Sequence, residues 1–153
     1  VDTIDEALLI VRWYSQRWHI EQFFRTLQKQ GLDIESSQVE TSAALMKLVI
    51  LSCFAAIQVM QLSLAREGKD QSVSVVFNEP ECKLLSKLQQ KLEGKTQKQK
   101  NPHRIGMLTW AAWIIARLGG WKGYASESPP GPITMLRGLT QFKTLYEGWS
   151  LVE

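Results

Sequence analysis

Cysteine and histidine are scarce in this 153-residue sequence, which contains only two of each. Cys53 and Cys82 lie far apart, and His19 and His103 are isolated, so neither pair has the spacing of a zinc or redox motif. This composition excludes a disulfide-stapled scaffold and fits a reducing cytoplasm. No secretory leader pattern is visible.

Other extremes of composition are missing as well. The sequence has five prolines, ten glycines and no internal repeat, which excludes collagen-like and low-complexity classes. Apolar residues make up 44% and charged residues 22%, both near the averages for globular proteins, and the length suffices for a core. The net charge of +3 is compatible with a polyanionic partner without proving one.

Helix start and stop signals recur along the chain. A capping box over Thr3–Glu6 begins the first helix, and Gly31 is a natural stop. Thr41 and Asn78 are further candidate caps, and Pro132 opens the last helix. These signals predict five helices, over residues 4–30, 42–67, 79–93, 105–118 and 132–149. Residues 32–40 and 72–77 leave room for short strands, so we predict a mainly α fold with at most a minor strand.

The second predicted helix has the composition of a membrane span. Residues 48–65 carry no charge and are just long enough to cross a bilayer. Four polar residues are spread along them, namely Ser52, Gln58, Gln61 and Ser63. Because a central core helix is also apolar nearly all round, we predict a core helix and no membrane partner.

The first predicted helix carries an ordered set of polar residues. At 100° per residue, the side chains of Tyr14, Arg17, Glu21, Arg25 and Gln28 fall within an arc of roughly 80°, with Lys29 at its edge. We call this arc the polar stripe. A second arc of roughly 100° is predicted to be buried, Trp13 included, and we call it the apolar face. It comprises Leu9, Trp13, Ile20, Phe23, Phe24 and Leu27.

Two interpretations of the polar stripe follow from the residues alone. It is a solvated face whose i,i+4 ion pairs contribute a few tenths of a kcal/mol each. Alternatively, Glu21 binds a divalent cation while Arg17 and Arg25 hold phosphate oxygens, an arrangement suited to metal-dependent chemistry on nucleic acid. Spacing does not decide between them.

A second charged region lies over the third predicted helix and the loop after it. Its cations are Lys83, Lys87, Lys91, Lys95, Lys98, Lys100 and Arg104. Such a run is usually a solvated face beside a buried leucine stripe. A track for a DNA backbone is the alternative, with strong salt dependence as its signature. Both interpretations stay open at this stage.

The stretch YSQRWHIEQFFRTLQKQG, residues 14–31, resembles the C-terminal signature of the YREK group of bacterial insertion-sequence transposases, within the DDE superfamily. That pattern is a Tyr, an Arg three residues on, a Glu four further on and a Lys seven beyond it. Tyr14, Arg17 and Glu21 match it, whereas Gln28 stands at the lysine position with Lys29 beside it. The resemblance continues through NPHRIGMLTWAAWIIARLGGWKGY and PPGPITMLRGLTQFKTLYEGW, and covers most of residues 5–151.

The resemblance implies a division of the chain and a set of roles. Residues 1–68 would be the C-terminal helical part of a ribonuclease-H-like catalytic core, and residues 69–153 a helical tail. Glu21 would be the catalytic glutamate and a ligand of Mg²⁺ in the full-length parent. Tyr14, Arg17, Arg25 and Lys29 would contact DNA at the transposon ends. DNA is the implied partner in a bacterial cytoplasm, and pairing of subunits through the tail is an open alternative.

The two aspartates of the family's triad have no counterpart here. Before Glu21 the sequence offers only Asp2, Asp5 and Glu6, all at a helix start and several turns away. We therefore expect this chain alone neither to bind Mg²⁺ tightly nor to cleave DNA. Two other classes remain open: a regulatory fragment that pairs with full-length transposase, and a non-catalytic helical DNA-binding module.

Overall fold

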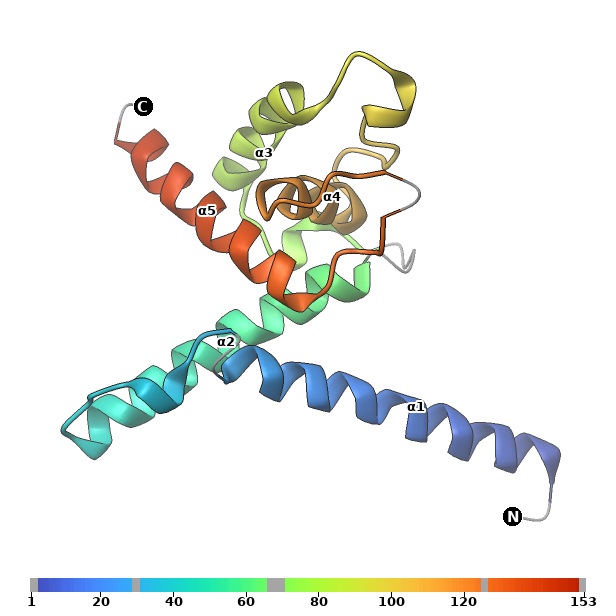
Figure 1. Ribbon diagram of the computed structural model, residues 1–153, viewed down its shortest axis with the longest axis vertical. Helices are drawn as coiled ribbons and strands as arrows, with labels where there is room; N and C mark the ends of the chain where they lie inside the picture. The colour runs from blue at the N-terminus through green and yellow to red at the C-terminus, as the bar shows by residue number, and fades with distance from the viewer. Residues whose placement is uncertain (1–2, 29–30, 66–70, 125–126, 152–153) are drawn as a thin grey trace. The chain divides into compact units, whose positions relative to one another are not determined.

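The computed structural model describes residues 3–28, 31–65, 71–124 and 127–151, which form five α-helices and three short 3-10 turns (Figure 1). The helices are α1 (Ile4–Leu27), α2 (Ser42–Ala65), α3 (Glu79–Leu92), α4 (Leu108–Leu118) and α5 (Pro132–Ser150). The turns are η1 (Ile34–Ser36), η2 (Val73–Val75) and η3 (Gln97–Gln99). The mainly α prediction is confirmed. The chain divides into two compact units, residues 1–60 and 61–153.

The helix caps act as the sequence indicates. The Thr3 hydroxyl accepts a hydrogen bond from the Glu6 backbone N–H, and Thr41 does the same for Ala44. Asn78 and Glu81 form a reciprocal capping box at the start of α3. Helix α4 begins three residues later than predicted, whereas the predicted end of α2 lies outside the described residues.

Helix α1 ends at Leu27, earlier than its predicted stop, because the chain turns back onto the helix. The backbone N–H of Leu32 donates to the Thr26 carbonyl at 2.8 Å, and that of Gly31 to the Gln28 carbonyl at 2.8 Å. A Cβ on Gly31 would lie 1.9 Å from the Thr26 carbonyl oxygen, so only glycine fits there. The close turn therefore explains this glycine.

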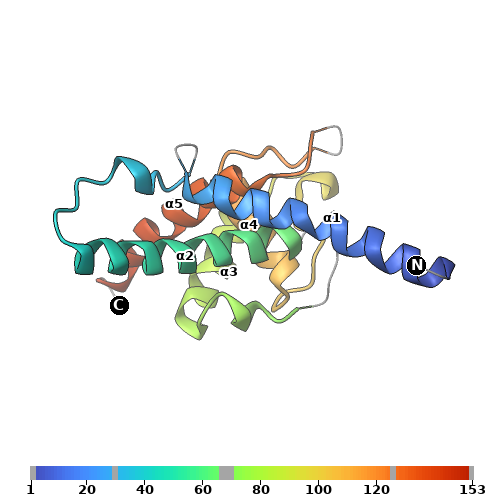
Figure 2. The same cartoon turned by 90° about the horizontal axis from the view of Figure 1, so that it is seen from below.

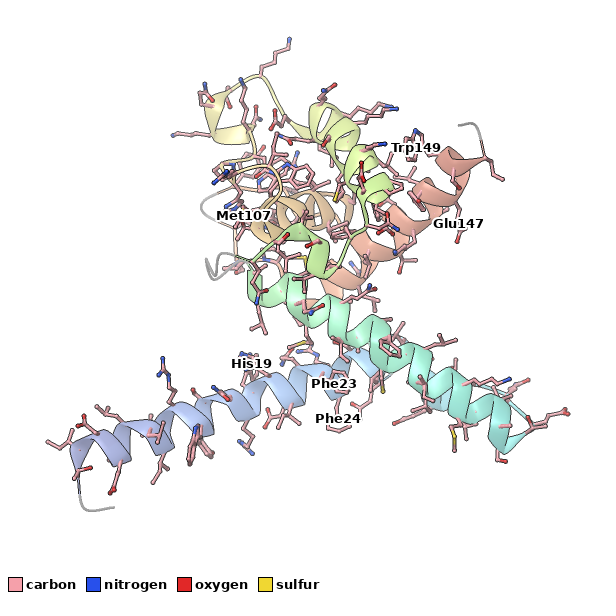
Figure 3. The ribbon with its side chains drawn as sticks, turned by 180° about the vertical axis from the view of Figure 1, so that it is seen from behind. His19, Phe23, Phe24, Met107, Glu147 and Trp149 are labelled. Atoms are coloured by element: carbon pink, nitrogen blue, oxygen red, sulfur yellow. The ribbon has the colours of Figure 1, made fainter. Side chains whose placement is uncertain are left out.

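In the N-terminal unit, α1 meets α2 only near its own C-terminal end, and the segment with η1 runs back to the start of α2 (Figures 1 and 2). His19, Phe23 and Phe24 lie at this end of α1 (Figure 3). The buried residues of α1 are polar: Gln22, and Thr26, whose hydroxyl donates to the Gln22 carbonyl at 2.8 Å. By helical geometry, their side is turned roughly 130° from the apolar face.

The apolar face of α1 is largely exposed, so the prediction that it is buried is wrong for most of its length. Trp13 is 62% exposed, and Ile20 and Phe24 are more than half exposed. The sequence pattern shows which side is apolar, but not whether this chain supplies the surface that covers it. The described residues offer little against the first four turns of α1.

Helix α2 also departs from expectation. Its first two-thirds expose large apolar side chains such as Met46, Leu51 and Phe54, and burial becomes regular only from Ala56 onward. By length and composition this helix could cross a membrane, and only 17% of its most apolar window is buried. The prediction of a central core helix is therefore wrong for this part of α2. A single such helix is weak evidence for a membrane protein.

The C-terminal unit has a well-packed core built around α4. Nine consecutive residues of this helix, Trp110 among them, are buried from residue 108 to 116, and α3, α5 and η2 all pack against it (Figure 1). Helices α4 and α5 approach closely because Gly138 faces the Ile115 carbonyl, where a Cβ would lie 1.8 Å from the oxygen. Phe77 and Phe142 meet edge to face, with ring centroids 5.3 Å apart.

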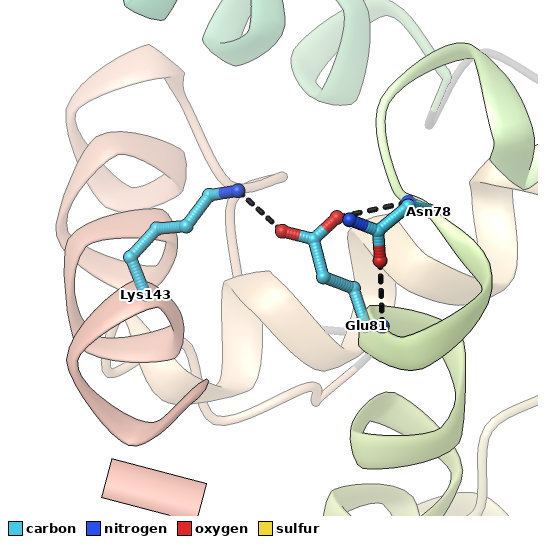
Figure 4. Close-up of polar contacts among 3 residues, drawn as sticks. All are labelled: Asn78, Glu81 and Lys143. Carbon is cyan, nitrogen blue, oxygen red and sulfur yellow. Dashed lines mark hydrogen bonds and ion pairs between the residues drawn. The ribbon is translucent and has the colours of Figure 1, made fainter. Parts of the chain in front are cut away.

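Polar contacts connect the helices of this unit. The Trp110 indole N–H donates to Gln89 Oε1 at 2.6 Å, which joins α4 to α3. Lys143 of α5 donates to the buried Glu81 carboxylate of α3 (Figure 4). Because buried polar groups are costly without partners, these contacts specify how the helices pair.

The predicted strand over residues 72–77 is a 3-10 turn instead. Its valines alternate as in a strand, but no neighbouring segment of the described chain pairs with it beyond one isolated bridge between Ser72 and Met107. The Ser72 hydroxyl accepts from the Ser74 backbone N–H, which favours the turn. Val73, Val76 and Phe77 are buried in the core.

Candidate nucleic-acid interface

The polar stripe is ordered along one side of α1, a helix of 24 residues and roughly 36 Å. The Arg17 guanidinium lies over the Tyr14 ring, 5.0 Å from its centroid. The same group reaches Glu21, with 3.4 Å between Nη2 and Oε1. One arginine therefore holds the tyrosine and the glutamate in a single row, an arrangement that spacing alone could suggest but not show.

This row is open to solvent. The side chains of Arg17 and Glu21 are 62% and 50% exposed, and Tyr14 is exposed as well. Arg25 is exposed one turn further on, and Gln28 caps the helix end. Lys29 lies outside the described residues. In water an exposed ion pair of this kind contributes about 1 kcal/mol or less, so the row adds little stability to the fold.

Among the residues that the structure describes, no acidic side chain lies close enough to Glu21 to share a metal ion. Asp5 and Glu6 lie on the same helix, but about 24 Å and 22 Å away along its axis at 1.5 Å per residue. Among the described residues, no three His, Cys, Asp or Glu side chains lie close enough to hold a metal. Mg²⁺ prefers several oxygen ligands, so the donor set present here does not make a magnesium site by itself.

A cavity in the C-terminal unit was not anticipated from the sequence. It has a volume of about 510 Å³ and is lined mainly by rings and prolines, with Trp113, Trp121 and Tyr124 among them. One lining carboxylate, that of Glu127, already accepts a hydrogen bond from the Lys122 backbone N–H at 2.9 Å. The lining residues come from separate stretches of sequence, so no local motif marks the cavity.

Comparison with known protein families gives a match in the N-terminal part of the chain. Residues 1–57 match the family model described as Transposase DDE domain. The matched residues include all of α1, the polar stripe and more than half of α2. They make up just over a third of the chain, and the match supports a DDE transposase.

Proposed function

We propose that this chain is the C-terminal part of a DDE transposase of the YREK group, which carries out metal-dependent cut-and-paste transposition. The observation that carries the proposal is the row of Tyr14, Arg17 and Glu21, which lies within the residues that match the transposase model. In this proposal Glu21 is the catalytic glutamate, and residues 1–68 belong to the catalytic core.

The exposed apolar surface of the N-terminal unit supports the same proposal. Many large apolar side chains of α1 and α2 are exposed to solvent, although soluble proteins rarely expose so many together. In a ribonuclease-H-like core, helices cover a sheet. We infer that the apolar face of α1 packs on such a sheet, supplied by residues that this chain does not contain. Packing against such a core would also explain why α2 is apolar, without placing it in a membrane.

The residues of the stripe fit contact with DNA phosphates. Arg17 presents a planar guanidinium that matches phosphate oxygens in a bidentate manner, and Tyr14 adds a hydroxyl donor beside it. On binding, a phosphate would compete with Glu21 for Arg17. Arg25 extends the contact by one turn. Lys29 is proposed to contact DNA as well, because it follows Gln28, which occupies the lysine position of the family pattern.

Magnesium belongs to this proposal only for the full-length parent. In related enzymes the metal assists an in-line displacement at phosphorus. The two aspartates that would complete its site are not among the residues of this chain, so no step through the metal follows from it. We therefore propose that the isolated chain does not cleave DNA.

The first test is the DNA immediately upstream of the Val1 codon in the source genome. An open reading frame in phase that encodes strands ending in two aspartates would support an enzyme. A stop codon directly before Val1 would overturn the catalytic proposal and favour the regulatory fragment, whose mark is inhibition of a full-length transposase in trans.

The second test is Glu21→Gln in the chain extended by that reading frame. We expect Mg²⁺-dependent nicking of transposon-end DNA to fall by a factor of about 1,000 or more, as when an essential catalytic group is removed. Glu35→Gln makes the same change at an exposed loop position and is the matched control. Equal nicking by the two variants would refute the assignment of Glu21.

A further inference from the structure

The C-terminal unit carries a concentration of positive charge that the proposed function does not use. Residues 79–104 contain seven cations and three glutamates, a net charge of +4, whereas the rest of the chain sums to −1. All seven cations are exposed in the structure. We call them the lysine surface: Lys83, Lys87, Lys91, Lys95, Lys98, Lys100 and Arg104.

The carboxylates nearest in sequence do not neutralise this surface. Glu81 is turned into the protein, where it accepts from Lys143 and from the Asn78 backbone N–H (Figure 4). Glu93 accepts from the Gln89 side chain at 2.6 Å and from the Asn101 backbone N–H at 3.0 Å. Two of the three glutamates are therefore committed to the fold.

Three of the lysines bring like charges together on α3. Lys83, Lys87 and Lys91 follow at i,i+4 on one edge of α3, where like charges destabilise a helix by a few tenths of a kcal/mol per pair. Lys87 is directed to the Trp149 ring, 4.9 Å from its centroid. Throughout the described chain, Lys91, Lys95, Lys98, Lys100 and Arg104 form no salt bridge. These five exposed cations are therefore available to a polyanion.

The fold of α3 favours one kind of polyanion. A basic helix binds lipid headgroups by also inserting an apolar face, but of the four leucines of α3, Leu84 and Leu85 are buried in the core of the unit and the other two are half-buried. Six of the seven cations are lysines, which act as flexible point charges and suit phosphate contacts that do not depend on sequence. Helix α3 leads directly into the loop with η3, so the seven exposed cations lie on one continuous stretch of the C-terminal unit.

We propose that the lysine surface is a second DNA-binding surface of this protein, which holds the backbone of duplex DNA without reading its sequence. It lies on the C-terminal unit, whereas the polar stripe lies on the N-terminal unit. It does not depend on catalysis by Glu21, so the two proposals succeed or fail separately.

The test is binding of the 153-residue chain to a random-sequence duplex of about 30 base pairs, measured by fluorescence anisotropy across salt concentrations. The test variant is Lys95→Gln, Lys98→Gln and Lys100→Gln together. The control variant is Arg12→Gln, Lys47→Gln and Arg137→Gln, which removes the same charge from exposed positions elsewhere. Each lost phosphate contact should reduce the slope of log K against log salt by about 0.9, so by roughly 2.7 for three contacts.

A smaller slope in the test variant alone supports the proposal, provided that circular dichroism shows both variants folded. Equal slopes in the two variants overturn it, because the effect then follows net charge and not position. Absence of duplex binding by the unaltered chain also overturns it, as does tighter binding to anionic vesicles than to the duplex at the same salt concentration.

Discussion

Lys143 on α5 and Glu81 on α3 form an ion pair across the C-terminal unit, with 2.5 Å between Nζ and Oε1 (Figure 4). The Glu81 side chain is only 6% exposed, and its second oxygen accepts from the Asn78 backbone N–H at 2.8 Å. One carboxylate therefore caps its own helix and also attaches a helix that lies 62 residues further along the chain.

Removal of the cation should leave Glu81 buried without its counter-charge. We expect Lys143→Met to lower the free energy of unfolding by about 2 kcal/mol, less than for a fully buried pair because Lys143 is partly exposed. Urea denaturation measures the change. Lys91→Met is the matched control and should cost about 0.5 kcal/mol or less, as is usual for an exposed position. Equal losses in the two variants would contradict a structural role for the pair.

The crossing of α4 and α5 predicts opposite effects for two identical substitutions. Gly138→Ala places a Cβ 1.8 Å from the Ile115 carbonyl oxygen, so the helices must separate and we expect a loss of about 2–3 kcal/mol. Gly148→Ala, on the same helix, meets no atom within 4 Å and should stabilise it by about 0.5–1 kcal/mol. Thermal denaturation distinguishes them, and equal melting temperatures would disprove the close approach.

The exposed apolar face of α1 predicts that polar replacements there are tolerated. We expect Trp13→Gln with Ile20→Gln to change the free energy of unfolding by about 0.5 kcal/mol or less, since both side chains are more than half exposed. The pair should also reduce binding of the dye ANS. Trp110→Gln, inside the core of the other unit, should instead cost about 3 kcal/mol or more. A large loss from the first pair would show that the face is covered in this chain.

The thiol of Cys82 should react slowly. Burial, and then the carboxylates of Glu81 and Glu79, raise its pKa above the ordinary value, so less thiolate is present near pH 8. In a Cys53→Ser background, alkylation by iodoacetamide should therefore accelerate at a higher pH than in the urea-unfolded chain. The preference for the neutral thiol stabilises the fold below the unfolded-state pKa of the thiol. It is lost as pH rises through the folded pKa. Identical pH profiles would refute the shift.

Local chemistry in the sequence predicted the helices well. Thr3, Thr41 and Asn78 cap where their side chains indicate, because a cap depends on residues three positions apart. The strand predicted from the alternating valines of residues 72–77 was wrong, because a strand needs a partner strand and the local sequence does not show whether one is present. The prediction that Trp13 is buried was wrong for a similar reason, since periodicity identifies an apolar face but not the surface that covers it.

The candidate site was predictable only in part. The spacing of Tyr14, Arg17 and Glu21 places them on one side of a helix, and the structure adds that Arg17 contacts both neighbours. The Glu81–Lys143 pair and the aromatic cavity unite residues from distant parts of the chain, and no local pattern marks them. The catalytic role of Glu21 remains a prediction, because no described residue supplies either of the two aspartates that would act with it.

Because few residues pack against α1, this helix should unfold locally more often than the other helices. A single helix held mainly at one end is marginally stable in water, so the backbone amides of its first four turns should exchange with solvent far faster than those of α4. Glu21 sits near the boundary between the free and the anchored turns. Any surface that comes to cover α1 would therefore do more than bury apolar atoms. It would also slow local unfolding around Glu21. The polar stripe would then become fully ordered only when α1 packs against that surface.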